Sequence, residues 1–341
     1  MKKLRIALFS PLWESVPPKL YGGIERMIYN LARGLTEKGH KVTLFASGDS
    51  TKEFPLVSVS PIALFRDQKL VRPQAYNYLI LKKLLEQADN FDIIHDHSFY
   101  EPLILAGLIK TKMIHTIHLE VVPEMRELFL ACPEVIYTAL SNDHKNRSGL
   151  KNCQVIYNGI DIAPYKFQEK ATDNYLVWLG RISHLKGTKE AILVAKEAGE
   201  KLIIAGKVNK VDEEYYQKEI KPSVDDRQIK YIGEVDDWQK SNLLGGAKAL
   251  ISPINWDEPF GLVVVEAMAC GTPVIANNRG AMVELIQNDQ TGFLTENWQE
   301  MVGKIKRVDN LDRLLCRKTV EDRFTLERMV DQYELLYQQI I

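Results

Sequence analysis

The sequence predicts an α/β fold made of two doubly wound parallel sheets, one in each half of the chain. Short apolar runs alternate with amphipathic stretches along the whole length, which is typical of βα units. The runs are apolar throughout, as expected where helices cover both faces of a parallel sheet. A length of 341 residues fits two domains of ordinary size.

In the first half, the apolar runs predict strands at 4–9, 41–46, 91–95, 112–117, 135–140 and 154–157. The first helix is predicted by apolar side chains at helical spacing, namely Ile24, Met27, Ile28, Leu31 and Leu35. Gly39 is placed to end this helix.

A second series of strands follows residue 161, at 175–179, 201–205, 229–232, 249–253, 273–276 and 292–294. The polar stretch 168–174 is interpreted as a linker. The stretch 325–341 is predicted to be helical, because apolar residues from Leu326 to Tyr337 fall on one side. Two such sheets in tandem predict a ligand cleft between their carboxyl edges.

Composition excludes several classes of protein. With 45% hydrophobic and 26% charged residues, the chain is ordinary globular material. No apolar run reaches about 18 residues, so no transmembrane helix is expected, and the start lacks the long apolar core of a signal peptide. Four scattered cysteines, Cys132, Cys153, Cys270 and Cys316, fit reduced thiols in a cytoplasmic protein.

Charge is unevenly spread. Residues 1–160 hold 20 Lys and Arg against 16 Asp and Glu, a balance of +4, and the remainder has a balance of −5. A peripheral contact with an anionic membrane surface at the inner face is therefore a hypothesis, and ordinary scatter is the alternative. No basic stripe with interleaved aromatics occurs, so nucleic acid is not an expected partner.

The run 258–274, EPFGLVVVEAMACGTPV, is the most informative stretch. Glu258 and Glu266 lie eight positions apart around a predicted loop-to-helix turn at Phe260, Gly261, Leu262 and Val263. A helix N-terminus is a ready site for phosphate, and Gly261 lets an anion approach the backbone. One carboxylate would flank the phosphate while the other holds ribose hydroxyls. Helix capping with a surface glutamate is the alternative on spacing alone.

Two further clusters follow predicted strands. Gly22 and Gly23 precede the first helix and would let backbone approach a phosphate or sugar, although this pair taken alone favours a structural turn. Arg181 and Lys186 flank the loop before Gly187, where two cations could balance a diphosphate without a metal. Solvated surface cations are the alternative for this pair.

Histidines and aspartates complete the candidates. Six of seven histidines precede residue 150, and His118 at the end of an apolar strand is the best placed for a cleft. Their spacing matches no zinc motif, so no metal site is predicted. Asp236 and Asp237 precede a helix-like stretch and are interpreted as an N-terminal cap. Together the clusters predict a nucleotide diphosphate bound by the second domain.

These motifs, in this order, resemble the retaining GT-B glycosyltransferases of family 4. The resemblance covers nearly the whole chain. It rests on Gly22-Gly23 with Glu25, His118, the tetrapeptide 158–161, Gly180-Arg181 with Lys186-Gly187, the tetrapeptide 232–235, Glu258 with Glu266, and Gly280 to Glu284. Ala281 stands where a second glycine is common in the family.

The resemblance implies two Rossmann-like domains, an acceptor-side domain at 1–165 with a crossover helix at 324–341, and a nucleotide-sugar domain at 166–323. The role implied for Arg181 and Lys186 is to hold the donor diphosphate. Glu266 would bind the ribose, and Glu258 and His118 the transferred sugar. The remaining donor contacts implied are Gly22, Gly23, Val235, Phe260, Gly261, Leu262 and Val263.

The activity implied is retaining transfer of a hexosyl group from a UDP- or GDP-linked sugar to a glycan, lipid-linked or small-molecule acceptor. No metal or cofactor is expected, since the nucleotide sugar is a substrate. The leaving phosphate is thought to take the acceptor's proton in this family, while the protein supplies position and charge. A sugar-nucleotide epimerase or hydrolase and a non-catalytic sugar-nucleotide binding protein remain as alternatives. A dehydrogenase is disfavoured because GxGxxG is absent.

Aromatic side chains in the first half are candidates for acceptor binding. Trp13, Tyr21, Phe99 and Tyr100 can stack on a sugar or lipid face, and core packing is the alternative for each.

Overall fold

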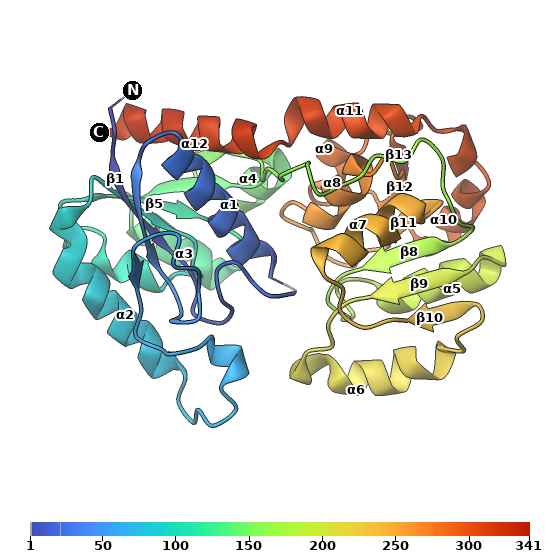
Figure 1. Cartoon of the computed structure of the whole chain (residues 1–341), viewed down its shortest axis with the longest axis horizontal. Helices are drawn as coiled ribbons and strands as arrows, with labels where there is room; N and C mark the ends of the chain where they lie inside the picture. Colours follow the sequence, from blue (N-terminus) through green and yellow to red (C-terminus); the bar gives the residue numbers. More distant parts are fainter. Residues whose placement is uncertain (1, 21) are drawn as a thin grey trace. The chain divides into compact units, whose positions relative to one another are not determined.

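The computed structural model describes residues 2–20 and 22–341, so Tyr21 lies outside the described residues. The chain divides into two compact units (Figure 1). The first comprises Met1–Gly159 with Leu326–Ile341, and the second comprises Ile160–Thr325. Both sheets are parallel and covered by helices, which confirms the predicted fold class. Among the described residues, no helix is long and apolar enough to cross a membrane.

The first unit is built on a seven-stranded sheet with the order β3-β2-β1-β4-β5-β6-β7. The strands are β1 (Arg5–Phe9), β2 (Lys41–Phe45), β3 (Leu56–Val57), β4 (Ile93–Asp96), β5 (Lys112–Thr116), β6 (Ile136–Ala139) and β7 (Cys153–Val155). The helices are α1 (Gly23–Glu37), α2 (Gln74–Gln87), α3 (Pro123–Ala131), α4 (Asn142–Ser148) and α12 (Leu326–Ile340). All the predicted strands of this half are present, and only β3 was not predicted.

Two apolar cores cover the two faces of this sheet. Ile6 and Leu8 of β1 belong to one core, with side chains of α1 and α12. Ala7 and Phe9 alternate with them and belong to the other core, with side chains of α2 and α3. This alternation explains why the strand is apolar at every position. The predicted C-terminal helix therefore completes the core of the first unit.

The second unit is built on a six-stranded sheet with the order β10-β9-β8-β11-β12-β13. The strands are β8 (Leu176–Leu179), β9 (Leu202–Ala205), β10 (Ile229–Tyr231), β11 (Ala249–Ser252), β12 (Val274–Asn277) and β13 (Gly292–Thr295). The helices are α5 (Thr188–Ala198), α6 (Glu213–Tyr215), α7 (Asp237–Gly246), α8 (Leu262–Ala269), α9 (Met282–Leu285), α10 (Trp298–Ile305) and α11 (Arg313–Arg323). Every predicted strand of this half is present.

In each sheet the strand order reverses beside the strand that starts the unit. The first sheet runs from β1 outward to β2 and β3, and then continues from β4 on the other side of β1. The second sheet reverses in the same way between β8 and β11. Ligands of open α/β sheets bind outside the carboxyl ends of the strands at such a reversal. The loops after β1, β4, β8 and β11 are therefore where a ligand is expected.

Candidate functional site

In the second unit, the loops that follow β8 and β11 are hydrogen-bonded to each other. The backbone N–H of Asn255 donates to the carbonyl of Leu185 over 2.8 Å, and its side-chain amide donates to the carbonyl of His184 over 3.1 Å. Gly187 has φ +69°, and a Cβ there would lie 1.9 Å from the carbonyl oxygen of Pro253. Only glycine permits this close approach of the two loops.

This approach brings Lys186 and Glu258 together. The Lys186 ammonium forms an ion pair with Oε2 of Glu258. The indole N–H of Trp256 donates to the same oxygen over 2.9 Å, and Lys186 Nζ lies 4.7 Å from the centre of the indole ring. Lys186 and Glu258 are largely buried, with 22% and 15% of their side chains exposed. The Lys186 ammonium and the Glu258 carboxylate thus lie together in a partly buried position beside α8.

The N-terminus of α8 follows Glu258 directly. Gly261 is the N-cap residue with φ +100°, and no side chain caps this end. Leu262 and Val263 are the first two helical residues, so their N–H groups have no partner within the helix. The helix end carries a partial positive charge and attracts an anion. The predicted loop-to-helix turn is confirmed.

The loop that carries Glu258 is fixed by the turn after β12. The backbone N–H of Ala281 donates to the Glu258 carbonyl over 2.9 Å, and Arg279 Nε pairs with Asp257 Oδ1 at 3.0 Å. A Cβ on Gly280 would lie 2.5 Å from the Glu258 nitrogen. The Gly280 turn thus holds the Glu258 backbone in place. The Phe260 ring, in contrast, is buried against Phe324 at 5.8 Å between ring centres and belongs to the packing of the unit.

Glu266 lies on the fifth residue of α8 and is buried. The Tyr165 hydroxyl donates to its Oε1 over 2.7 Å, and Lys240 Nζ lies 2.6 Å from the same oxygen. Lys240 comes from α7, whose N-cap is Asp236 with a capping box to Gln239, as predicted for that aspartate. Val235 immediately precedes this cap and is half-buried. The Glu266 carboxylate therefore has partners of its own, and both of them contact Oε1.

Arg181 is not paired with Glu258 or Glu266. Its Nε lies 3.6 Å from Oδ2 of Asp212, in the segment that follows β9. Burial raises the pKa of Asp212, and the Arg181 charge opposes that rise. One third of the Arg181 side chain is exposed. Arg181 thus lies at the same edge of the sheet as Lys186 but with a different partner.

In the first unit, Gly22 is the N-cap of α1 and Gly23 its first residue, after β1. Among the described residues, no side chain caps this helix end, and a Cβ on Gly22 would lie 2.6 Å from Pro18 Cβ. Both glycines therefore lie at a close backbone turn, as the sequence predicted for them.

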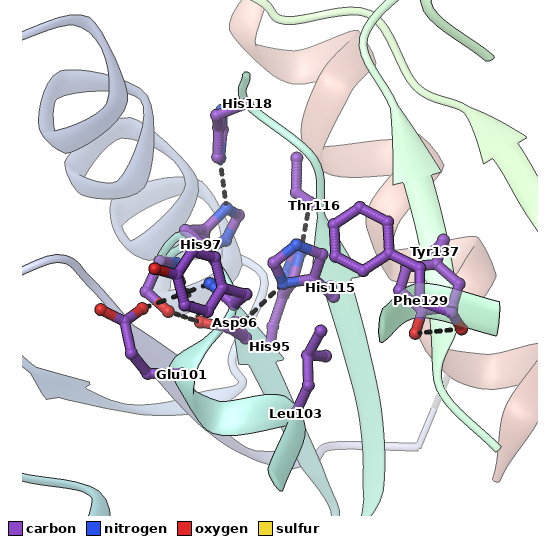
Figure 2. Close-up of polar contacts among 12 residues, drawn as sticks. His95, Asp96, His97, Glu101, Leu103, His115, Thr116, His118, Phe129 and Tyr137 are labelled. Carbon is purple, nitrogen blue, oxygen red and sulfur yellow. Dashed lines mark hydrogen bonds and ion pairs between the residues drawn. The ribbon is translucent and has the colours of Figure 1, made fainter. Parts of the chain in front are cut away.

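His118 follows β5 and forms a hydrogen bond with His97, which follows β4 (Figure 2). His118 Nε2 and His97 Nδ1 are 3.1 Å apart. His97 is fully buried, its ring lies 3.9 Å from that of His95, and its Nε2 is unpartnered among the described residues. Burial, together with His115 and His144, lowers the pKa of His118 to about 3. His118 is therefore a neutral imidazole held at the end of β5.

The neighbouring histidines belong to the interior. His95 bonds the Tyr337 hydroxyl at 2.6 Å. It also bonds Thr116 at 2.7 Å, and His115 bonds Asp96 at 2.5 Å (Figure 2). Burial lowers the pKa values of His95 and His97 well below the ordinary value. Among the described residues, no group of three or more His, Cys, Asp or Glu side chains is arranged to hold a metal ion.

Sequence reasoning missed three side chains that contact the two glutamates. Trp256 stands two residues before Glu258, and this proximity is the only signal in the sequence. Lys240 lies one helical turn after the predicted cap Asp236. Helical spacing from that cap is the signal that could have predicted a position of Lys240 on the side toward α8. Tyr165 is 101 residues from Glu266 in the chain, and no local pattern indicates that contact.

Comparisons with known proteins agree with this architecture. Residues 21–163 match the family model described as Glycosyltransferase Family 4, and residues 160–321 match the model described as Glycosyl transferases group 1. Among curated relatives, the chain is 24% identical to N-acetyl-alpha-D-glucosaminyl L-malate synthase of Bacillus anthracis, over 91% of this chain and 92% of the relative.

Two solved structures have the same fold. AviGT4, a glycosyltransferase involved in avilamycin A biosynthesis, is 26% identical with a TM-score of 0.74, covering 99% of this chain and 98% of that one. Anabaena HepE, solved with UDP and glucose, is 19% identical with a TM-score of 0.78, covering 99% and 100%. The two family models together span both units. The chain belongs to glycosyltransferase family 4, as a GT-B enzyme that transfers sugars from nucleotide sugars.

Proposed function

We propose that this enzyme transfers a hexosyl group from a UDP- or GDP-linked sugar to a glycan, lipid-linked or small-molecule acceptor, with retention of the anomeric configuration. The observation that supports this most is the Lys186–Glu258 ion pair beside the uncapped N-terminus of α8. The Lys186 ammonium and the Glu258 carboxylate thus lie beside helix N–H groups that have no partner within α8, at the point where the strand order reverses. This combination of groups suits a diphosphate joined to a sugar.

Lys186 and Arg181 are proposed to bind the donor diphosphate and to stabilise the charge that develops as it leaves. The amides of Leu262 and Val263, after Gly261, are proposed to add hydrogen bonds to phosphate or sugar, and the Phe260 backbone lies in the same turn. In the structure, each of these cations pairs with a carboxylate, Arg181 with Asp212 and Lys186 with Glu258. Donor binding therefore exchanges each of these partners for phosphate.

Glu266 is proposed to bind the ribose hydroxyls, and Val235 to lie against the base. Glu258 is proposed to contact hydroxyls of the transferred sugar. In the first unit, Gly22 and Gly23 are proposed to contact a phosphate or sugar through their backbone, and His118 is proposed to hydrogen-bond a sugar hydroxyl. Because its pKa is about 3, His118 would act as a neutral hydrogen-bonding group.

The two cations support a reaction without a divalent metal ion, because they supply the charge that a metal would bring to the diphosphate. We expect EDTA to leave the transfer rate unchanged. A loss of activity that Mg²⁺ or Mn²⁺ restores would contradict this part of the proposal.

The experiment that tests the proposal is calorimetry with UDP, GDP and NAD, followed by a donor-hydrolysis screen over UDP- and GDP-sugars. Binding of a nucleoside diphosphate with slow donor hydrolysis is expected. Tight NAD binding without diphosphate binding would overturn the proposal. Binding without turnover on any sugar or acceptor would favour the non-catalytic alternative, and release of an epimerised free sugar would favour the epimerase.

Arg181→Ala and Lys186→Ala are each expected to reduce transfer by more than about tenfold, the scale of one lost charged contact to a developing anion. The reduction should appear in kcat with the fold intact by circular dichroism. Lys189→Ala serves as the matched control, since Lys189 lies nearby on α5 and pairs with Glu219 on the surface. Wild-type rates in Arg181→Ala or Lys186→Ala would contradict the phosphate assignment.

A peripheral membrane contact through the first unit is proposed for an acceptor that is lipid-linked. Large apolar side chains are exposed there on neighbouring segments, including Phe65, Val71, Tyr78 and Ile104, and this half of the chain has a balance of +4. Co-sedimentation with anionic vesicles at low salt tests the contact, and absence of binding there would remove it.

A further inference from the structure

One oxygen of Glu258 carries two different partners. The Trp256 indole donates a hydrogen bond to Oε2, and the Lys186 ammonium pairs with the same atom. Oε1 is left for a substrate hydroxyl. The Lys186 charge also lies over the Trp256 ring at 4.7 Å, within the range of a cation–π contact.

Glu266 repeats this arrangement with unrelated residues. The Tyr165 hydroxyl donates to Oε1, and Lys240 pairs with the same atom at 2.6 Å. Lys240 Nζ lies 5.5 Å from the centre of the Tyr165 ring and also contacts Asp237 at 3.4 Å. Oε2 is left for a ribose hydroxyl. Each glutamate is thus held by one aromatic donor and one lysine on a single oxygen.

We propose that Trp256 and Tyr165 are positioning residues, which hold the carboxylates of Glu258 and Glu266 in the orientation that the substrate needs. This inference rests on the proposed function of the two glutamates. Hydrogen bonds to a carboxylate are about twice as strong as those between neutral groups. Both donors belong to rigid rings, so they fix the plane of the carboxylate with little loss of rotamer entropy.

Lys186 has two roles in this proposal, since it pairs with Glu258 in the structure and is proposed to bind the donor diphosphate. Trp256 matters because Lys186 cannot do both at once. When Lys186 turns to the donor diphosphate, Glu258 loses its ion pair at the moment when it must meet the sugar. The Trp256 N–H comes from the same loop, two residues away, and its hydrogen bond is a separate contact from the ion pair. It therefore keeps Oε2 occupied while Oε1 accepts a sugar hydroxyl. Glu266 has no such conflict, because Lys240 is not assigned to phosphate.

Replacing each aromatic donor by phenylalanine tests the inference, because an aromatic ring stays beside the lysine while the hydrogen-bond donor is lost. Trp256→Phe is expected to lower kcat for donor hydrolysis by about tenfold, the scale of one hydrogen bond to a charged group. Affinity for the free nucleoside diphosphate, which lacks the sugar, should remain unchanged.

Tyr165→Phe is measured with the nucleoside diphosphate that the wild type binds best, UDP or GDP, and with its 2′,3′-dideoxy analogue. The preference for the hydroxyl-bearing nucleotide should fall by about tenfold, and affinity for the dideoxy analogue should not change. A purely structural role for Tyr165 would weaken binding of both nucleotides equally.

Double-mutant cycles separate positioning from packing. Trp256→Phe should have no further effect in a Glu258→Ala background, and Tyr165→Phe none in a Glu266→Ala background, because each donor acts only through its carboxylate. The crossed pair, Trp256→Phe with Glu266→Ala, should be additive. Full additivity in the matched pairs would overturn the inference.

Matched controls are available in the same unit. Tyr175→Phe removes a phenol that donates to the Leu243 carbonyl over 2.8 Å, and Trp298→Phe changes an indole packed at the edge of the unit's core. Neither touches the two glutamates, so both variants should keep wild-type kinetics. Equal losses in the controls and in the test variants would overturn the inference.

A measurement on the wild type covers the case in which a variant fails to fold. The Trp256 indole N–H resonance should stay protected from exchange with water when UDP or GDP is added, and loss of protection would overturn the role of Trp256. The proposed function fails separately, if the wild type binds no nucleoside diphosphate. Intact binding with unaffected phenylalanine variants would reject only the inference.

Discussion

At the scale of residues, the candidate site side chains of the two units differ in charge. The second unit holds ion pairs in which lysine meets carboxylate, at Lys186 with Glu258 and at Lys240 with Glu266. The first unit instead gathers histidines that burial keeps neutral. Charged groups suit an anionic ligand, and a neutral imidazole suits hydroxyl groups.

The histidines whose pKa values are lowered predict an acid-sensitive stability. His95, His97 and His118 have lowered pKa values in the folded chain, so the unfolded chain binds more protons once the pH falls below about 6.5. Each such histidine then removes up to about 1.4 kcal/mol of unfolding free energy per pH unit until it titrates in the folded state.

Urea denaturation at pH 7.5, 6 and 5 measures this loss of unfolding free energy. In His118→Asn, the unfolding free energy should fall less steeply with decreasing pH, by the contribution of one histidine. An unchanged dependence of unfolding free energy on pH in the variant would show that His118 has its ordinary pKa, and would contradict the lowered value.

At the scale of elements, two helix ends decide the geometry of the candidate site. The loop before α5 passes against the end of β11, and the uncapped start of α8 faces the same region. Gly187 and Gly199 bound α5 with nearly equal dihedrals, φ +69° and +68°. A Cβ on Gly187 would meet the Pro253 carbonyl at 1.9 Å, and one on Gly199 would meet nothing within 4 Å.

This pair gives a matched prediction. Gly199→Ala should cost about 1–2 kcal/mol, the price of a left-handed alanine. Gly187→Ala should cost more than about 3 kcal/mol, because the clash adds to the same backbone strain. It should also lower activity by displacing Lys186. Denaturant unfolding of both variants checks the difference, and equal costs would show that the loop relaxes freely away from Pro253.

At the scale of the whole molecule, the end of the chain belongs to the unit formed by its beginning. Helix α12 supplies Met329, Val330 and Leu336 to one core of the first unit. The hydroxyls of Tyr333 and Tyr337 bond Thr116 and His95 inside it. The first unit is therefore complete only after the whole second unit has been added to the chain.

Removal of residues 326–341 is expected to unfold the first unit. Each large side chain lost from a core costs about 2–5 kcal/mol, and several are lost here, against a total stability of about 5–15 kcal/mol. Removal of only 338–341 keeps the buried side chains of α12 up to Tyr337 and should leave the fold intact. Solubility and circular dichroism of the two truncations compare them, and a folded chain without 326–341 would contradict the assignment of α12 to the core.

Much of the fold could be predicted because its signals are local. A buried strand such as β1 is apolar at every position, and α1 shows helical spacing ending at Gly39. Strand β3 escaped prediction because it has two half-buried residues after a proline. The candidate site could be predicted at Lys186, Glu258 and Gly261, where a loop motif follows a strand. The roles of those residues remain proposals.

The sequence by itself determined the alternation of strands and helices, the loops that carry charge, and the glycines that begin helices. These depend on side-chain period and on backbone freedom, which a few neighbouring residues decide. Only the tertiary structure decided that Lys186 meets Glu258, that Arg181 pairs with Asp212, and that Tyr165 reaches Glu266. Such contacts depend on strand order. Strand order is set by the packing of apolar faces that are distant in the chain, so no short stretch of sequence indicates it.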